Sequence, residues 1–301
     1  MADLFDIQLL HMTLRTVVPV LLAALGGTLC ERAGLFNVAL EGMMLAGAFG
    51  AVAGSFFLGG AGWGVLAAIA AATAIGLILA CLSLNLRANE IVVGISLNLL
   101  VTGLTTFLMR VVLGATGTFH HPDLKGLPQW SPEWLQAIPV LGRLLSGHTP
   151  VVWAAYLAVP VLSYFLFRTT VGLRLRAVGE HARAAQTLAV NPFRMQYLAV
   201  VLAGVLTGLA GAQLSLGQVR IFQENMTAGR GFIALVAVIF GRAHPTGVLL
   251  ASLLFGLIDA LGIRLQGVGL PSQVTGLLPF VVTLLTLVAL RGRGLNRQGT
   301  A

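Results

Sequence analysis

Apolar runs, each bounded by a short polar stretch, follow one another along almost the whole chain. With about 20 apolar residues per membrane-spanning helix as the template, they predict about nine passes. In chain order these are Leu10–Cys30, Gly34–Phe57, Gly62–Leu84, Ile91–Leu113, Pro150–Phe167, Tyr197–Gly217, Gly231–Phe240, Thr246–Ile263 and Gly276–Leu290. The seventh has only about ten residues, so we expect a tilted or broken helix enclosed by protein or by a water cavity.

The pattern therefore predicts an all-α polytopic membrane protein, with about eight to ten passes in one membrane domain over residues 1–301. Composition supports this class. Hydrophobic residues make up 57% of the chain and charged residues only 9%, against about 25% charged residues in soluble domains. The N-terminus carries Asp3 and Asp6 and no basic residue before the first apolar run, which argues against a cleaved signal peptide.

Arginine accounts for nearly all of the net charge of +8, because Lys125 is the one lysine. The polar stretch 168–196 has the densest basic cluster: Arg168, Arg174, Arg176, Arg183 and Arg194. Basic loops are retained in the cytoplasm, and alternating passes put 11 of the 18 basic residues, these five included, on that side. We therefore expect the N-terminus outside and the C-terminus in the cytoplasm. The partners of the positive charge are expected to be lipid head groups and not nucleic acid.

The segment 114–149 then becomes the one long extracytoplasmic loop. Four prolines argue against a continuous helix over its length, and Trp134–Leu145 is predicted to lie on the membrane surface as a helix. Two interpretations stay open for this loop. It is either a landing surface for a substrate-delivering protein or a connector anchored in lipid by its tryptophans.

The stretch 168–196 contains a predicted short helix, Glu180–Val190. Asn191-Pro192 ends it, because the residue before a proline is pushed out of the helical region. Its small apolar residues recur at helical spacing and form one face: Ala184, Ala185, Leu188 and Ala189. Such a helix on a cytoplasmic loop suits insertion into a groove of a partner protein. The alternative is an ordinary basic loop that only sets topology.

Polar side chains inside the predicted spans are candidates for function, since a charge at the bilayer centre costs about 2.5–3.5 kcal/mol on insertion scales. They are Asn37, Glu41, Asn98 and Asp259. Asn37 lies four residues before Glu41, on the same face of the predicted helix. Three roles are open for this pair. It could line a route for a hydrogen-bonding solute, couple proton movement, or join helices through hydrogen bonds with Arg110 or Asn98.

Glycine patterns give two further expectations. Gly204, Gly208 and Gly211 form a small-residue face that lets helix backbones approach closely. A short internal repeat also recurs at one constant offset, in which Ala33-Gly34 and Ala39-Leu40 match Ala228-Gly229 and Ala234-Leu235. Transporter membrane domains are often built from two related halves. The repeat is a trace of such halves or a coincidence in a chain rich in Ala, Gly and Leu.

Enzyme motifs are missing from the sequence. It contains no G-x-x-x-x-G-K-[ST] phosphate loop, no H-E-x-x-H zinc motif and no G-x-S-x-G elbow. The two cysteines, Cys30 and Cys81, lie in or at the end of apolar runs and indicate neither a disulfide framework nor a metal site. We therefore expect a chain that is not an enzyme, with no cofactor, no metal and no ATP site of its own.

Several stretches resemble known permeases. Gly179, Glu180 and the Ala184-Ala185 pair are similar to the coupling loop by which permease subunits of ATP-driven (ABC) importers dock on their ATPase; the family's usual glycine is replaced by Ala189. Arg183 directly precedes the Ala184-Ala185 pair in this loop. Three longer stretches resemble the permeases that import nucleosides and simple sugars, a family that includes ribose and branched-chain amino-acid permeases: Glu31–Phe49, Asn89–Leu100 and Ala228–Leu261.

The resemblance implies a permease of the bacterial inner membrane that works by alternating access, with nucleosides as substrates and purine nucleosides favoured. It implies three protein partners: a separate ATPase with two nucleotide-binding halves, a second permease in a heterodimer, and an extracytoplasmic substrate-binding protein. A simple sugar such as ribose, or a branched-chain amino acid, is the alternative substrate. A proton-coupled secondary transporter is the alternative of a different class.

Overall fold

The computed structural model describes residues 7–130, 146–266 and 281 of the chain. Its helices are α1 (Ile7–Arg32), α2 (Leu40–Leu58), α3 (Ala61–Ala80), α4 (Glu90–Val112), α7 (Pro150–Arg168), α8 (Thr170–Thr187), α9 (Pro192–Ala212), α10 (Arg230–Phe240) and α11 (Pro245–Gln266). Short π-helical segments, Cys81–Asn85 and Gln213–Val219, extend α3 and α9. Two short antiparallel strands, β1 (Thr118–Phe119) and β2 (Phe222–Gln223), complete the described part.

Seven of these helices are long and apolar enough to cross a membrane, counted over the described residues. The predicted seventh segment is also a helix, and α10 is as short as expected, with 11 residues. A mostly helical polytopic architecture is therefore confirmed. Apart from Val281, the predicted span Gly276–Leu290 lies outside the described residues, as does the predicted surface helix Trp134–Leu145.

Among the predicted boundaries that differ from the structure, two have a clear local reason. α2 begins at Leu40 and not at Gly34, because Gly34 adopts the left-handed conformation at φ 76 and stops the helical path. α8 begins at Thr170 and not at Glu180, because the Thr169 side chain caps its first turn by accepting from the Gly172 amide. α8 is then interrupted at His181, whose backbone is not helical.

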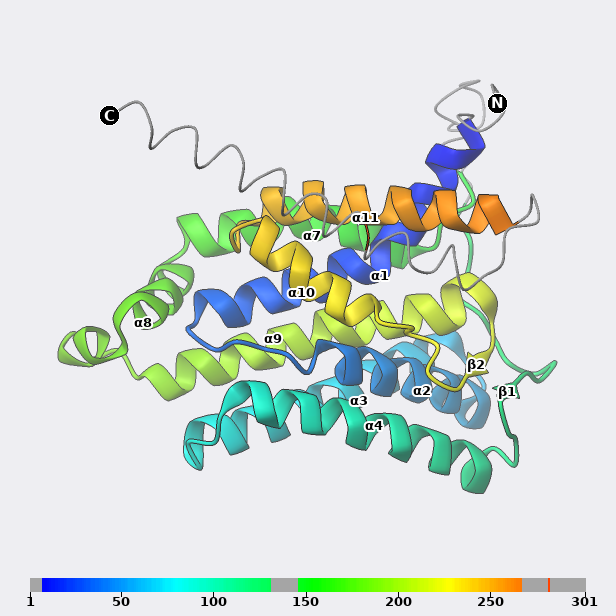
Figure 1. Cartoon of the computed structure of the whole chain (residues 1–301), viewed down its shortest axis with the longest axis horizontal. Coiled ribbons are helices and arrows are strands. Elements are labelled where there is room, and N and C mark those ends of the chain that lie inside the picture. Colours follow the sequence, from blue (N-terminus) through cyan, green and yellow to red (C-terminus); the bar gives the residue numbers. More distant parts are fainter. Residues whose placement is uncertain (1–6, 131–145, 267–280, 282–301) are drawn as a thin grey trace.

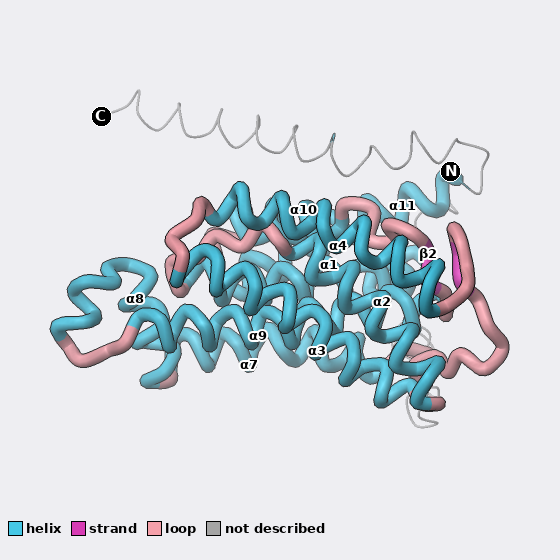
Figure 2. Tube along the Cα trace, turned by 90° about the horizontal axis from the view of Figure 1, so that it is seen from below, coloured by secondary structure: helices cyan, strands magenta, loops and turns pink. Residues whose placement is uncertain are grey.

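The core of the bundle is formed by three helices. These helices have the largest buried share in their most apolar stretch: 72% of the residues in α1 and in α2, and 67% in α9. The corresponding share is only 28% in α7 and 33% in α4. α1 and α9 run side by side through the middle, with α7 and α11 on one side and α2, α3 and α4 on the other (Figure 1). α8 projects from one end of the bundle, whereas β1 and β2 lie at the opposite end (Figures 1 and 2).

The predicted small-residue face on α9 is confirmed by its contacts. A Cβ on Gly208 would lie 2.6 Å from the Ile69 Cα of α3, and a Cβ on Gly211 would lie 2.5 Å from the Met44 carbonyl oxygen of α2. Helix backbones in a membrane associate through such close packing, since lipid gives no hydrophobic drive for it. Only glycine lets α9 lie this close to α2 and α3 at the same time.

We predict opposite effects for one substitution at two helical glycines. Gly208→Ala should lower the stability of the folded chain by about 1–3 kcal/mol, because the new methyl group overlaps the α3 backbone. Gly103→Ala in α4 should raise it by about 0.5–1 kcal/mol, because nothing lies within 4 Å of the new Cβ. Thermal unfolding of the detergent-solubilised variants measures both. A stable Gly208→Ala variant would show that α9 and α3 are not tightly packed.

Candidate functional site

Two helices begin inside the bundle rather than at its ends, α2 and α10 (Figure 1). Glu41, in the first turn of α2, is buried at 6% exposure. Its two carboxylate oxygens accept hydrogen bonds from the first residues of α10: the Gly229 amide at 2.9 Å and the Gly231 amide at 2.6 Å. The positive ends of both helix dipoles therefore meet at one carboxylate, which is the charge that such ends favour.

Glycine makes this contact possible. Gly229 precedes α10 with φ 83, a left-handed conformation that costs glycine little. A Cβ on Gly231 would collide with the backbone of Glu41, so the two chains touch without side chains between them. The glycine-rich stretch that begins at Ala228 is thus explained by a close approach of two backbones, which composition alone does not reveal.

A row of α4 residues binds the non-helical segment that leads into α2. Glu90 accepts from the Phe36 amide at 2.6 Å. Asn98 accepts from the Gly42 amide at 2.8 Å and donates to the Val38 carbonyl at 3.0 Å. Between them, Gly94 leaves room for the Val38 side chain. Glu90, Gly94 and Asn98 recur every four residues and so share one face of α4.

Asn37 is turned back onto its own segment. Its side-chain oxygen accepts from the Ala39 amide at 3.0 Å, and its amide nitrogen points to the sulfur atoms of Met43 and Cys30 at 3.4 and 3.7 Å. In this structure, three of the four candidate polar residues, Asn37, Glu41 and Asn98, thus bind the backbone around the start of α2 or α10. Their predicted place on a solute route stays a prediction.

One expected partner is wrong. Arg110 does not join Asn37 or Glu41: its side chain is 59% exposed and lies 4.0 Å from Glu224. Asn98 is close to the pair, but it binds the backbone at Gly42 and not the Glu41 carboxylate. Sequence analysis missed Glu90 as a functional candidate. The four-residue spacing from Glu90 through Gly94 to Asn98 was the available signal.

The short internal repeat is accompanied by a similar turn and one similar hydrogen bond at equivalent positions. Gly34 has φ 76 and Gly229 has φ 83. Two residues further on, the Phe36 and Gly231 amides each donate 2.6 Å hydrogen bonds to a glutamate in the first turn of a neighbouring helix, Glu90 of α4 and Glu41 of α2. Equivalent positions thus make equivalent contacts, as expected for two related halves.

Asp259 lies apart from this junction, on α11. Its Oδ2 atom is 3.2 Å from the Arg230 Nη2 atom of α10, and the two side chains are 31% and 21% exposed. Both residues line a cavity of about 310 Å³ between α1, α10 and α11. Among the described residues, no group of three or more His, Cys, Asp and Glu side chains is arranged to bind a metal ion.

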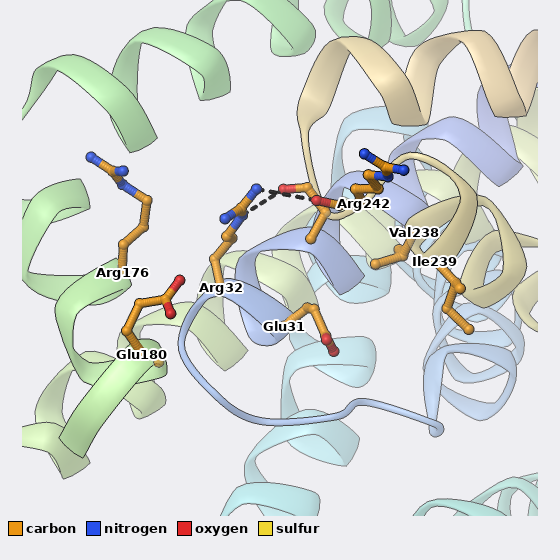
Figure 3. A pocket seen from close by; sticks show the side chains of 9 residues that line it. Glu31, Arg32, Arg176, Glu180, Val238, Ile239 and Arg242 are labelled. Carbon is orange, nitrogen blue, oxygen red and sulfur yellow. Dashed lines mark hydrogen bonds between the residues drawn. The ribbon is translucent and has the colours of Figure 1, made fainter. Parts of the chain in front are cut away.

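A second cavity, of about 380 Å³, lies near the α8 end of the bundle (Figure 3). Its charged lining comes from three helical regions: Glu31 and Arg32 at the end of α1, Arg176 and Glu180 on α8, and Arg242 just after α10. Arg32 donates to the carbonyl oxygens of Ala243 at 2.7 Å and Arg242 at 3.1 Å (Figure 3). The end of α1 is therefore tied to the end of α10.

Gly179 brings α8 against the end of α1. A Cβ at this position would collide with the Arg32 carbonyl oxygen, and a Cβ on Gly34 would lie 3.1 Å from the Gly179 Cα. Gly179 thus contacts the bundle itself. The remainder of the predicted coupling segment, after the break at His181, extends away from it (Figure 2).

The predicted apolar face of this segment is wrong in detail. Ala185 is 3% exposed and points inward, whereas Leu188 is 77% exposed and Ala184 and Ala189 are also exposed. The cause is a helix end at Thr187, after which Ala189 takes the left-handed conformation at φ 58 and Val190 donates to the Ala185 carbonyl. This conformation costs an L-residue about 1–2 kcal/mol, which explains why a glycine at this position suits the resembling permeases.

A bundle of long apolar helices, with two helices that begin in its interior, defines the membrane domain of a multi-pass transporter. Residues 9–287 match the family model described as the permease component of the branched-chain amino acid transport system. The chain belongs to this family of ABC transporter permeases. It is therefore a multi-pass membrane protein and a transport component.

Three relatives are similar over most of their length. A Haloferax volcanii protein named "Putative glucose ABC transporter permease protein TsgC13" is 38% identical, over 93% of this chain and 86% of its own. The guanosine permease NupQ of Bacillus subtilis is 35% identical, over 93% and 91%. The nucleoside permease NupC of Lactococcus lactis is 35% identical, over 92% and 90%.

Two solved structures share the fold. PsaBC from Streptococcus pneumoniae aligns with a TM-score of 0.53 and 15% identity, over 94% of this chain and 91% of that chain. An ABC transporter in an inward-facing conformation aligns with a TM-score of 0.52 and 16% identity, over 92% and 85%. At such low identity these likenesses concern the fold alone.

We predict that Glu41→Gln lowers stability by about 2–3 kcal/mol. The amide has one acceptor oxygen where two α10 amides point, and the charge between the two helix N-termini is lost. Glu180→Gln, at an exposed position, should change stability by less than about 0.5 kcal/mol. Thermal unfolding in detergent measures both, and uptake per folded molecule tests the solute route. Normal stability with impaired uptake would favour the solute route over a structural role for Glu41.

Proposed function

We propose that this chain is the membrane-spanning permease subunit of an ATP-driven importer of nucleosides, with purine nucleosides favoured. The observation that carries the proposal is the 35% identity to permeases named for guanosine and for nucleosides, over about nine-tenths of each chain. A simple sugar stays the second candidate, because a relative named for glucose is 38% identical. The family description keeps branched-chain amino acids as a third.

The segment Arg183–Ala189 is the proposed docking site for a separate ATPase. It extends from the end of the bundle, and Leu188, 77% exposed, offers an apolar side chain of the kind that fills a partner's groove. Gly179 and Glu180 are proposed to connect this segment to the bundle and not to contact the ATPase. They lie beside the end of α1, so they join the docking segment to the bundle.

The movement imposed by the ATPase then has a continuous route inward. Gly179 contacts Gly34, and the segment from Gly34 leads to Glu41, which binds the start of α10. A ligand shifts a conformational equilibrium only through different affinities for the two states. ATP binding to the partner is the proposed source of that difference, and α8 is its point of entry.

The remaining features of the proposal concern topology and partners. The α8 end faces the cytoplasm of a bacterial cell, the N-terminus lies outside, and about nine passes cross the inner membrane. A second permease subunit completes a heterodimer. An extracytoplasmic substrate-binding protein docks at the β1–β2 end, where residues 114–130 and 146–149 lie.

The hydrogen bonds of Glu41 bear on the alternative of a proton-coupled carrier. Both carboxylate oxygens accept from backbone amides of α10, so this side chain is engaged in joining α2 to α10. Dependence on ATP therefore fits the contacts of Glu41 better than dependence on a proton gradient. Uptake that persists after the gradient has collapsed would support this choice.

Co-purification tests the proposal as a whole. The full chain, tagged and expressed in its native cell, should bring with it an ATPase and a second permease. ATP hydrolysis by this complex in lipid vesicles should rise when its substrate-binding protein and guanosine or adenosine are added together. Stimulation by glucose, ribose or leucine but not by nucleosides would reject the substrate assignment. Concentrative uptake by the chain alone would reject the ATP-driven mechanism.

A matched pair of variants tests the docking segment. Ala184→Glu should weaken association with the ATPase at least tenfold, since about 1.4 kcal/mol is enough for that factor and a charge in an apolar groove costs more. Ala177→Glu places the same charge on the same helix before the break at His181 and should leave association unchanged. The measure is the ATPase recovered per tagged permease. Equal recovery with both variants would contradict docking at this segment.

A further inference from the structure

The cavity that contains Asp259 is enclosed by three helices. Its lining comes from α1, α10, α11 and the residue that leads into α10: Thr16, Val20, Ala228, Arg230, Ile233, Phe255, Gly256, Asp259, Ile263 and Gln266. Five apolar side chains and four polar or charged ones form the wall, a mixture that can hold both an apolar surface and hydrogen-bonding groups of a small molecule. At about 310 Å³ it is near the lower limit of such sites, so it suits a small solute.

The charged pair in this cavity has unused hydrogen-bonding capacity. Within the described part of the chain, the Asp259 carboxylate accepts from Arg230 at Oδ2, and its Oδ1 atom stays open. The Arg230 Nη1 atom has only long contacts, 3.4 and 3.5 Å to two backbone carbonyls. An ion pair inside membrane-spanning helices is costly and is commonly retained for function.

We propose that this cavity binds the solute in transit, a neutral nucleoside, with Asp259 Oδ1 accepting from sugar hydroxyl groups and Arg230 donating to acceptors on the base. The substrate class rests on the proposed function, whereas the site rests on the cavity. Because the two charges cancel, a neutral solute binds without separating them. A nucleoside monophosphate brings a negative charge next to Asp259, and an amino acid has to split the pair to use either charge.

The site is connected to the junction at Glu41. Arg230 lies between Gly229 and Gly231, the two residues whose amides Glu41 binds. A shift of the α10 N-terminus therefore displaces the guanidinium and changes its distance from Asp259 on α11. Solute sites of membrane transporters often lie where a helix is interrupted within the membrane, and α10 begins at such a place.

Protection of a cysteine tests binding directly. Ile263 lines the cavity and is 37% exposed, whereas Leu254, on the same helix, is 39% exposed and is not among the lining residues. Each becomes cysteine in a Cys81→Ser background, since Cys81 is exposed and Cys30 is buried. The full chain, with the subunits that co-purify, is labelled with a small maleimide in lipid nanodiscs.

Guanosine at about ten times its dissociation constant should slow labelling of the Ile263→Cys variant about tenfold by mass action, and labelling of the Leu254→Cys variant should not change. Guanosine monophosphate and leucine should protect neither. Protection by leucine but not guanosine, or equal effects on both variants, would overturn the inference.

Second-site variants separate binding from folding. Asp259→Asn, added to Ile263→Cys, should abolish protection by guanosine. Ser252→Ala, also on α11 but away from the lining, should preserve it. If Asp259→Asn preserves protection, the pair has no role in binding and the inference fails. The proposed function has a separate test, which is nucleoside-stimulated ATP hydrolysis by the unmodified complex. If hydrolysis is stimulated but the cysteine is not protected, the site is wrong and the function stands. If the cysteine is protected but hydrolysis is not stimulated, the site stands and the ATP-driven function fails.

Discussion

The meeting of two helix N-termini at the buried carboxylate of Glu41 is the constraint on which the rest of the bundle depends. The first amides of a helix have no partner within it, and an unpaired amide in an apolar interior costs several kcal/mol. α2 and α10 both begin where water is largely excluded. Glu41 binds two amides of α10, and Asn98 binds the Gly42 amide of α2. These side chains make an interrupted pair of helices possible inside a membrane protein.

The same constraint explains what could and could not be predicted from the sequence. Apolar length placed seven of the described helices, because crossing a membrane requires about 20 apolar residues in a row. It could not place the start of α2, since the segment from Gly34 to Ala39 is as apolar as the helix that follows. The partner of Glu41 lies about 190 residues away in the chain, and no local pattern encodes such a pairing. A helical wheel assumes a regular helix through Ala189. The left-handed backbone at Ala189 ends that regularity, so the wheel could not predict that Ala185 alone of this face is buried.

The proposed alternating access requires some helices to move, and α2 and α10 are held in different ways. α2 is fixed along its length, by α3 on one face and by Asn98 and Gly94 of α4 at its start. α10 is shorter; it packs against α1, α2 and α11, and side chains of other segments hydrogen-bond to the backbone at both of its ends. Glu41 binds its beginning, and Arg32 binds the carbonyl oxygens of Arg242 and Ala243 just after its end. Both anchoring residues flank the one segment that leads from α1 into α2.

That arrangement favours α10 as the element that moves. Gly179 of α8 contacts the backbone at Arg32 and Gly34, so residues 32–41 connect α8 to both ends of α10. Packed interiors switch between discrete arrangements and do not deform continuously. In the proposed mechanism, a pull at Arg32 selects between α10 hydrogen-bonded at both ends, as in this structure, and α10 released together with Arg230 and the cavity beside it. The proposed ATPase, by binding α8 differently in its two states, would select between them.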